Sequence, residues 1–500
     1  MSHSATSRAG TASPLVPIAW IAGGAIALWL VFSHGFVQYD TFYALVWGGE
    51  IAGGGDPDYS APLAPTPHPL ATLLGVLLSP LGDGAEAAVM VIAFLSLSAV
   101  AYLVYRLGAE WLNPAVGALA AAIVITRQPL LDFGVRAYVD IPYLALLLCA
   151  LLIETRRRRA GAPVLALLAV AGLLRPEAWL FSGAYLLYLV YGGPERPRGG
   201  LLAPVANFLR GRDGLLLAAL AVSAPVAWVL FDLVFAGDAL HSLTGTQDTV
   251  EALDRDTGLA GLVIDGPQRL GEVLREPVLI GAAVGIALCV TLRRDRALIG
   301  LAALVLSLAA FSVLAIAGLA VLTRYLLPAA AILAIFCAAG ALGWLDLARG
   351  DRWRRNWALI GAGLIVVMLA FVPAQVERIS DLRDSIEAQD ELGDDLRELA
   401  DSGAFDAGCG PITVPDERAI PFLALWLDEQ PSEILVAGDT ETQPEPTGYL
   451  LIGRSQNAKN LFTLGAGDTA REEPPIPNGA HRVESNDSWD VYETCATQPD

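Results

Sequence analysis

The stretch that decides the fold runs from residue 141 to residue 192 and reads IPYLALLLCALLIETRRRRAGAPVLALLAVAGLLRPEAWLFSGAYLLYLVYG. Apolar segments alternate here with an arginine cluster, Arg156 to Arg159, and with the charged break Arg175-Pro176-Glu177. Repeated apolar segments bounded by charges are typical of membrane-spanning helices, and a proline after a charged residue ends a helix. The pattern therefore predicts three spans at 141–155, 162–174 and 178–192.

The same pattern extends over most of the chain. Of the 500 residues, 54% are hydrophobic and only 17% are charged, and the mean hydropathy is +0.52. Soluble proteins carry roughly 25% charged residues. The deficit lies within the first 373 residues, which predicts a mostly α fold with a membrane domain at 18–373 and a soluble domain at 374–500. Further spans are predicted, for a total of about eleven, near 18–37, 87–107, 114–131, 214–235, 277–292, 297–319, 325–346 and 357–373.

Arginine clusters orient the predicted spans. Positive charge is retained on the cytoplasmic side of a membrane, and seventeen arginines fall on one side of the predicted topology against seven on the other side before residue 374. We therefore expect residues 1–17 and the C-terminal domain on opposite sides, with the N-terminus cytoplasmic and residues 374–500 outside. The clusters are Arg156–Arg159; Arg196, Arg198, Arg210 and Arg212; Arg293, Arg294 and Arg296; and Arg349, Arg352, Arg354 and Arg355.

Charge and cysteine content narrow the possible partners. The net charge of −20 has the wrong sign for nucleic-acid binding. The apolar spans predict that the chain's surroundings are the lipid bilayer of a cell membrane. Three cysteines, Cys149, Cys289 and Cys337, fall inside predicted spans and are typical of small core residues. Cys409 and Cys495 flank the C-terminal domain. If this domain lies outside the cytoplasm, the two cysteines either form a disulfide or remain as free thiols.

Two outer loops are long, at 38–86 and 236–276. The first contains an apolar segment, Leu70 to Leu81, which is too short to span and predicts a helix lying along the membrane. The C-terminal domain is predicted to be a small α/β domain. Its expected elements are helices at 375–399 and 417–427 and short strands at 412–414, 434–436, 449–452 and 489–492.

Polar residues at the outer membrane face are the candidates for chemistry, because such residues are costly in a membrane domain. Asp40 follows the first span, where it either acts as a general base or is a solvated acid that ends a helix. Arg136 and Asp140 stand four residues apart, so they form a local ion pair or they meet a phosphate and orient a reacting group.

The charged break and the last outer turn supply further candidates. Arg175 and Glu177 either pair with each other or line a cavity. Arg324 suits a lipid phosphate or anchors its helix at the membrane interface. His68 and His241 are either weaker site candidates or surface histidines. No metal-ligand spacing or phosphate-binding glycine loop is found, so any chemistry is expected to come from the loop carboxylates and arginines.

In their order along the chain, these motifs resemble the GT-C glycosyltransferases of the protein O-mannosyltransferase and aminoarabinose-transferase type. Asp40 stands where that family has an acid in its first outer loop, and Pro67-His68-Pro69-Leu70 is similar to its histidine–proline motif. Arg136 and Asp140 are similar to the family's Arg–Asp pattern before the fourth span. Arg324-Tyr325-Leu326-Leu327-Pro328 matches a segment near the family's last spans.

The resemblance implies transfer of a sugar from a polyprenyl- or dolichyl-phosphate donor to an extracytoplasmic acceptor, which is a glycan, a lipid or a protein. By resemblance Asp40 deprotonates or orients the acceptor hydroxyl, Arg324 holds the donor phosphate, and Asp140 with Arg136 supports the site. The site would be surrounded by His68, Arg175, Glu177, Tyr325 and His241. The resemblance also implies no metal and no cofactor, because enzymes of this type that use a lipid monophosphate donor generally manage without a bound metal. Two alternatives stay open from the residues alone: a transporter or flippase of lipid-linked saccharides, and a non-catalytic membrane scaffold.

Overall fold

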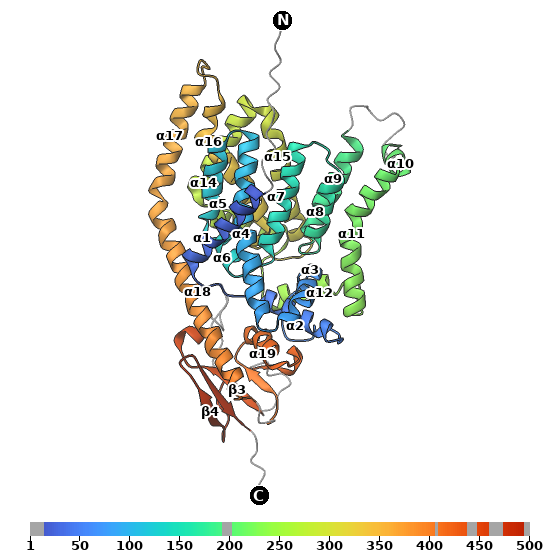
Figure 1. The fold of residues 1–500 in the computed structure, drawn as a ribbon, viewed down its shortest axis with the longest axis vertical. Helices are drawn as coiled ribbons and strands as arrows, with labels where there is room; N and C mark the ends of the chain where they lie inside the picture. The colour runs from blue at the N-terminus through green and yellow to red at the C-terminus, as the bar shows by residue number, and fades with distance from the viewer. Residues whose placement is uncertain (1–14, 193–202, 406–408, 438–447, 460–473, 495–500) are drawn as a thin grey trace.

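The structure, a computed structural model, describes residues 15–192, 203–405, 409–437, 448–459 and 474–494. Figure 1 shows a bundle of long helices with a small mixed domain at the C-terminal end of an elongated molecule. The chain leaves the bundle in the long helix α18 (Val372–Asp401), which leads into the mixed domain.

The regular elements of the bundle's described residues are all helices. Several of its helices are extended by short 3-10 turns, labelled η. The elements are α1 (Leu15–Phe32), α2 (Tyr39–Ala52), α3 (Pro69–Leu78), η1 (Ser79–Leu81), α4 (Gly84–Trp111), α5 (Pro114–Ile125), α6 (Gln128–Val135), α7 (Asp140–Arg156), α8 (Ala162–Gly172), α9 (Glu177–Tyr191), α10 (Ala203–Arg210), α11 (Arg212–Phe235), α12 (His241–Ala252), α13 (Gly258–Ile264), α14 (Gly266–Leu292), α15 (Arg294–Ile316), η2 (Thr323–Leu326), α16 (Leu327–Leu342), η3 (Gly343–Asp346) and α17 (Arg354–Ala370).

The number of membrane spans differs from the prediction. A helix occurs at each of the eleven predicted positions, but among the described residues only six are long and apolar enough to cross a membrane. The count rises to eight if two bent pairs, α5 with α6 (66°) and α17 with α18 (41°), each form one span. The predicted count of eleven is therefore not confirmed, because α7, α8 and α9 are short.

Helix α16 is the centre of the bundle. Every residue from Leu327 to Ala341 is buried. This agrees with its sequence, because a helix that is apolar on all sides is expected to be buried. Small residues let its backbone touch that of α14, since a Cβ added at Gly285 would lie 1.8 Å from the Phe336 carbonyl oxygen. Close approach of this kind is typical of helices packed in a membrane. The start of α16 is therefore a fixed point in the molecule.

Three of the predicted arginine clusters gather at one end of the bundle, where Arg156 pairs with Glu110 near the end of α4 and Arg354 donates to the Leu347 carbonyl after α16. Arg293 and Arg296, at the α14–α15 turn, lie 2.8 and 3.0 Å from Asp346 after α16. The Arg296 guanidinium also donates to the Leu112 carbonyl, at the end of α4. In Figure 1 this end points away from the C-terminal domain. In the remaining cluster, Arg196 and Arg198 lie outside the described residues.

The C-terminal domain is a five-stranded sheet with two flanking helices. Strand β1 pairs in parallel with β2 and β3, whereas β5 pairs antiparallel with β3 and β4, giving the order β2-β1-β3-β5-β4. The predicted strands are found, and the exposed edge strand β4 was missed. The elements are α18 (Val372–Asp401), β1 (Ile412–Val414), η4 (Glu417–Ala419), α19 (Ile420–Leu427), η5 (Pro431–Glu433), β2 (Leu435–Val436), β3 (Tyr449–Gly453), β4 (His481–Ser485) and β5 (Trp489–Glu493).

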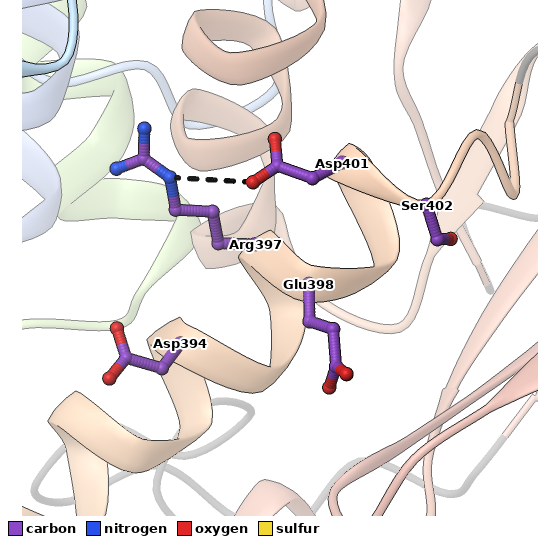
Figure 2. A pocket seen from close by; sticks show the side chains of 5 residues that line it. All are labelled: Asp394, Arg397, Glu398, Asp401 and Ser402. Atoms are coloured by element: carbon purple, nitrogen blue, oxygen red, sulfur yellow. Dashed lines mark ion pairs between the residues drawn. The ribbon is translucent and has the colours of Figure 1, made fainter.

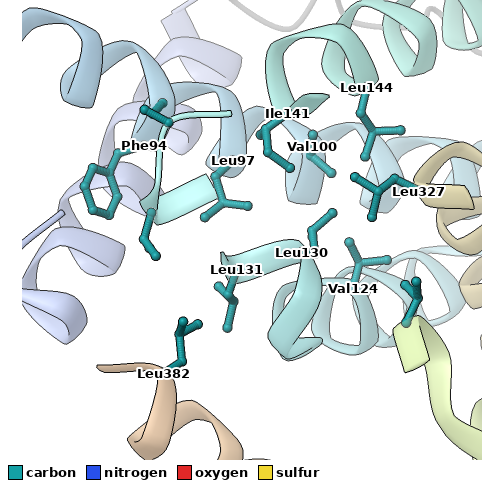
Figure 3. Close-up of a cluster of buried hydrophobic side chains, with 14 of the residues drawn as sticks. Phe94, Leu97, Val100, Val124, Leu130, Leu131, Ile141, Leu144, Leu327 and Leu382 are labelled. Carbon is teal, nitrogen blue, oxygen red and sulfur yellow. The ribbon is translucent and has the colours of Figure 1, made fainter. Parts of the chain in front are cut away.

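One apolar core joins this domain to the bundle. Figure 3 shows Leu382 of α18 close to apolar side chains of α6. In the same cluster lie Phe94, Leu97 and Val100 of α4, Val124 of α5, Ile141 and Leu144 of α7, and Leu327 of α16. Packing of α18 in this core places the C-terminal domain directly beside the first outer loop.

Candidate active site

Asp40 lies at the start of α2 and not at the end of the first span. Helix α1 ends at Phe32, and Gln38 caps the new helix by accepting a 2.9 Å hydrogen bond from the Asp40 backbone N–H. The carboxylate side chain is only 20% exposed. The alternative of a solvated acid that ends a helix is therefore wrong, because α2 packs against the bundle.

Arg324 is the partner of Asp40. Its guanidinium Nη1 lies 3.4 Å from Asp40 Oδ2, and its own side chain is 21% exposed. Arg324 belongs to η2, immediately before the central helix α16. The preceding residue, Thr323, donates a 3.0 Å hydrogen bond to Glu272 of α14. A fixed, permanently charged group thus stands at the N-terminus of the most buried helix.

A buried ion triad lies next to this pair. Arg175 Nη2 is 2.9 Å from Asp140 Oδ1, and its Nε is 3.5 Å from Glu177 Oε1. All three residues are at most 5% exposed. The Arg175 guanidinium also lies over the Tyr325 ring at 4.8 Å, and Arg324 lies 5.7 Å from the same ring. Tyr325 therefore connects the triad to the Asp40–Arg324 pair.

The N-terminal ends of several helices converge on these side chains. Asp40, Asp140 and Glu177 each stand in the first turn of their helix, α2, α7 and α9, and Arg324 precedes α16. Helix N-termini carry partial positive charge, which favours acids in the first turn and anions nearby. The convergence explains why three carboxylates are tolerated here, and it makes the site favourable for a phosphate.

His68 joins the cluster from the cap of α3. Its ring makes an edge-to-face contact with Trp228 of α11 at 5.7 Å. Burial lowers the pKa of His68 well below its usual range, and the nearby Arg175 and Arg324 charges lower it further. A lowered pKa favours the neutral imidazole, which adds no third positive charge and has one nitrogen that is able to accept a hydrogen bond.

Unused hydrogen-bonding capacity is present in this cluster. Within the described residues, sixteen buried side-chain atoms have no hydrogen-bond partner, and six of them belong to the cluster. Buried polar atoms normally find a partner, so these six atoms are available to a polar ligand. They are His68 Nδ1, Asp140 Oδ2, Arg175 Nε and Nη2, Glu177 Oε2 and Arg324 Nε.

Arg136 lies away from the cluster. Its Nε donates to Asp132 at 2.6 Å, and its other nitrogens donate to Ser385 and Gln389 of α18. The alternative of an ion pair with Asp140 is wrong, because Ala137 has a φ of +56° and no continuous helix joins the two positions. Asp140 pairs with Arg175 instead, as described above.

His241 also lies outside the cluster. It begins α12, and its ring packs against that of Tyr59 at 5.3 Å. The neighbouring Ser242 hydroxyl donates a 2.7 Å hydrogen bond to Asp232 at the end of α11. The His241–Tyr59 contact joins the second outer loop to the first. Among the described residues, His241 makes no contact with Asp40 or Arg324.

Cysteine and metal predictions have separate outcomes. Cys409 is disulfide-bonded, Cys149, Cys289 and Cys337 are free, and Cys495 lies outside the described residues. In the described ranges no group of three or more histidine, cysteine or acidic side chains has the geometry of a metal site. The expectation of a reaction without metal or cofactor stays a prediction.

The C-terminal domain closes over the first outer loop. Phe42 of α2 packs against Phe422 of α19 with ring centres 4.0 Å apart, and Asp58 accepts a 2.7 Å hydrogen bond from the Ser432 backbone. Figure 2 shows an open pocket on α18 whose lining residues are Asp394, Arg397, Glu398, Asp401 and Ser402. Arg397 also lies 2.7 Å from Asp83, so the domain is held by charges and aromatic rings.

Three contributors to the site were missed from the sequence. Gln38 holds the Asp40 end of α2, while Glu272 and Thr323 hold the Arg324 turn. Glutamine is not one of the residue types preferred at a helix N-cap, so the cap at Gln38 had no strong local signal. The Glu272–Thr323 contact joins distant segments and has no local signal.

Comparison with known proteins identifies the fold. No protein-family model matches the sequence, and no curated protein matches it. Two crystal structures of ArnT from Cupriavidus metallidurans are similar over nearly the whole chain. The structure bound to undecaprenyl phosphate has a TM-score of 0.56 and 12% identity and covers 96% of this chain and 98% of that chain. The apo structure has a TM-score of 0.50 and 13% identity and covers 95% and 97%.

A third similar structure is the apo oligosaccharyltransferase of Archaeoglobus fulgidus, with a TM-score of 0.47, 11% identity, and coverage of 82% of this chain and 64% of that chain. ArnT, the aminoarabinose transferase, is a GT-C glycosyltransferase. The similarity to ArnT confirms the resemblance suggested by the sequence motifs at the level of the fold: the chain has the GT-C fold.

Proposed function

We propose that this protein is a membrane glycosyltransferase that moves a sugar from a polyprenyl- or dolichyl-phosphate carrier to a hydroxyl-bearing acceptor outside the cytoplasm. In this reaction the acceptor oxygen forms a bond to the anomeric carbon of the sugar. The bond from that carbon to the phosphate oxygen breaks, and the lipid phosphate leaves with the electron pair. The acceptor proton passes to Asp40.

The observation that carries the proposal is the Asp40–Arg324 pair. A carboxylate and a guanidinium lie 3.4 Å apart, both are about one-fifth exposed, and they stand at the N-termini of α2 and η2–α16. A general base and a permanent cation are the two groups that the transfer requires, one for the acceptor hydroxyl and one for the leaving phosphate. The GT-C fold and the bound undecaprenyl phosphate of ArnT support the choice of carrier.

Asp140 takes a supporting role in this proposal, with Arg175 as its partner in place of Arg136. The pair is buried and Glu177 completes it, so the triad fixes the ends of α7 and α9 and holds Tyr325 beside Arg324. The free oxygen atoms of Asp140 and Glu177 accept hydrogen bonds from hydroxyl groups of the bound donor sugar.

In this proposal the site lies on the extracytoplasmic face. Support comes from three arginine clusters, which meet around the end of α4 and the segment after α16, at the other end of the bundle from the C-terminal domain, because positive charge is retained in the cytoplasm. The proposed orientation has the N-terminus inside and residues 374–500 and the acceptor outside the cell membrane.

A transfer assay in sealed vesicles tests the proposal. Purified protein is reconstituted and supplied with a panel of radiolabelled undecaprenyl- and dolichyl-phosphate sugars together with envelope extract as a source of acceptors. A transferase releases lipid phosphate and moves the label to a product that no longer extracts with the carrier. Movement of intact lipid-phosphate sugar across the vesicle bilayer without release of lipid phosphate would instead identify a flippase and overturn the proposal.

A further inference from the structure

We propose that Gln38 is a positioning residue for the reaction, which holds the Asp40 carboxylate in the orientation needed to accept the acceptor proton. The inference rests on the proposed function, in which Asp40 acts on the acceptor. It concerns a residue that touches Asp40 and is not required to touch the sugar or the acceptor.

The orientation of the Gln38 amide is fixed by its contacts. Its Oε1 lies 2.9 Å from the Asp40 backbone nitrogen, which is only a donor, so the oxygen and not the NH₂ group must face that nitrogen. The amide NH₂ group then faces the Asp40 carboxylate, and Nε2 lies 3.4 Å from Oδ1. One side chain thus begins the helix and donates to the reacting group.

Gln38 and Arg324 divide the two oxygens of Asp40 between them. Gln38 donates to Oδ1 and Arg324 to Oδ2, each at 3.4 Å. Two donors on opposite oxygens restrict rotation of the carboxylate about its terminal bond. A carboxylate has about four lone-pair sites, so a third donor can still bind it. Catalytic hydrogen bonds are often long before substrate binds and shorten afterwards. The third donor in this account is the acceptor hydroxyl.

The position of Gln38 is itself fixed from the bundle. Its backbone N–H donates to the Arg136 carbonyl at 3.1 Å, and the N–H of Phe36 donates to the Val135 carbonyl at 3.1 Å. The Arg136 side chain is held by Asp132 and by Ser385 and Gln389 of α18. Helix α18, which leads into the C-terminal domain, therefore supports the residue that orients Asp40.

Three variants separate positioning from simple helix capping. Gln38→Ser keeps a side chain that caps a helix but removes the donor to the carboxylate. Gln38→Glu keeps the size and the capping oxygen but replaces the donor with a second carboxylate. Gln38→Ala removes both contacts. Gln430→Ala is the matched control, because this exposed glutamine stands at the start of η5 and makes no side-chain cap.

The measurements are kcat, the donor KM and the pH profile of kcat/KM in the transfer assay, with thermal unfolding measured in parallel. We expect Gln38→Ser and Gln38→Ala to lower kcat about tenfold with the donor KM changed less than about twofold, since one hydrogen bond to a charged group is lost. Gln430→Ala should match the wild type in each measurement.

Gln38→Glu should lower kcat further and move the acid limb of the profile to higher pH. A second negative charge disfavours the anionic form of the base. The ionisable groups that interact with Asp40 in the structure are Arg324 of η2, Tyr138 before α7 and Tyr39 of α2 itself. They are unchanged in this variant, so a shift of the acid limb reports on the new carboxylate.

Two results would overturn the inference in different ways. If Asp40→Asn abolishes transfer while Gln38→Ser and Gln38→Glu retain the wild-type kcat and pH profile, Gln38 is only a helix cap and the proposed function stands. If Asp40→Asn transfers as fast as the wild type, the role of Asp40 is removed and that of Gln38 falls with it.

Discussion

The Arg324 guanidinium lies 3.4 Å from the Asp40 carboxylate, although 284 positions separate the two residues in the chain. The contact joins the first outer helix, α2, to the start of the central helix α16. Neither residue is fully buried, whereas the Asp140–Arg175–Glu177 triad beside them is. The accessible pair is therefore the reactive part of the cluster in this account, and the buried triad is its support.

Loss of the Arg324 charge should weaken binding of the lipid phosphate. We expect Arg324→Gln to raise the Kd for undecaprenyl phosphate about tenfold to a hundredfold, because a charge-assisted hydrogen bond to the phosphate is lost. Binding is measured with purified protein in lipid nanodiscs. Arg294→Gln, an exposed arginine at the other end of the bundle, is the control, and an unchanged Kd in Arg324→Gln would contradict the assignment.

Arg136 should behave differently from Arg324 in the same assay. Because its side chain holds α6 to α18, we expect Arg136→Gln to lower the melting temperature and leave the Kd for undecaprenyl phosphate within about twofold of the wild type. A Kd raised as far as in Arg324→Gln, with no loss of thermal stability, would restore Arg136 to a phosphate-binding role.

Breaking the buried triad should be costly. Arg175→Met leaves Asp140 and Glu177 as unpaired buried charges, and the expected loss is about 3–5 kcal/mol in the free energy of unfolding. Adding Asp140→Asn and Glu177→Gln to that variant should recover part of the loss, because no net charge then remains buried. Unfolding by denaturant measures both, with the exposed Arg210→Met as control. Equal stability of Arg175→Met and Arg210→Met would show that the triad contributes nothing.

Docking of the first outer loop should depend on pH through Glu50. Burial raises the pKa of Glu50 to about 7, while a hydrogen bond from the Asp58 backbone acts in the opposite direction. In the unfolded chain the pKa returns to about 4.5, so the folded state binds the proton more tightly. Above about pH 7 Glu50 is ionised in the folded state, and this ionisation destabilises the fold. The destabilisation decreases as the pH falls toward 5.

The melting temperature should therefore rise between pH 8 and pH 5 by a larger amount in the wild type than in Glu50→Gln. Comparing the two proteins cancels the contributions of all other groups. Glu251→Gln removes an exposed carboxylate and should keep the wild-type dependence. Identical slopes for the wild type and Glu50→Gln would rule out this contribution.

Local signals in the sequence predicted much of the bundle and the C-terminal domain. Apolar segments gave the position of each predicted membrane helix, and the break at Arg175-Pro176-Glu177 gave the turn between α8 and α9. The number of spans was not predictable in the same way. Bends such as the one between α5 and α6 depend on packing against neighbouring helices, and α7 to α9 are shorter than a full span.

The candidate site shows the same division between local and distant information. The spacing of Arg136 and Asp140 suggested one helical face, but Ala137 adopts a left-handed backbone conformation that alanine rarely takes. Asp140 then meets Arg175, which comes from a later turn. Such pairings depend on how the helices are arranged, so residue type could nominate Asp40 and Arg324 as candidates without revealing that they touch.

The most direct test of the central claim is the ratio of kcat for transfer between the wild type and Asp40→Asn, measured together with the Kd for undecaprenyl phosphate. If Asp40 takes the acceptor proton beside Arg324, kcat should fall about a hundredfold or more, while the lipid phosphate binds at least as tightly as before because Arg324 loses an anionic partner. Equal kcat values in the two proteins would contradict the account.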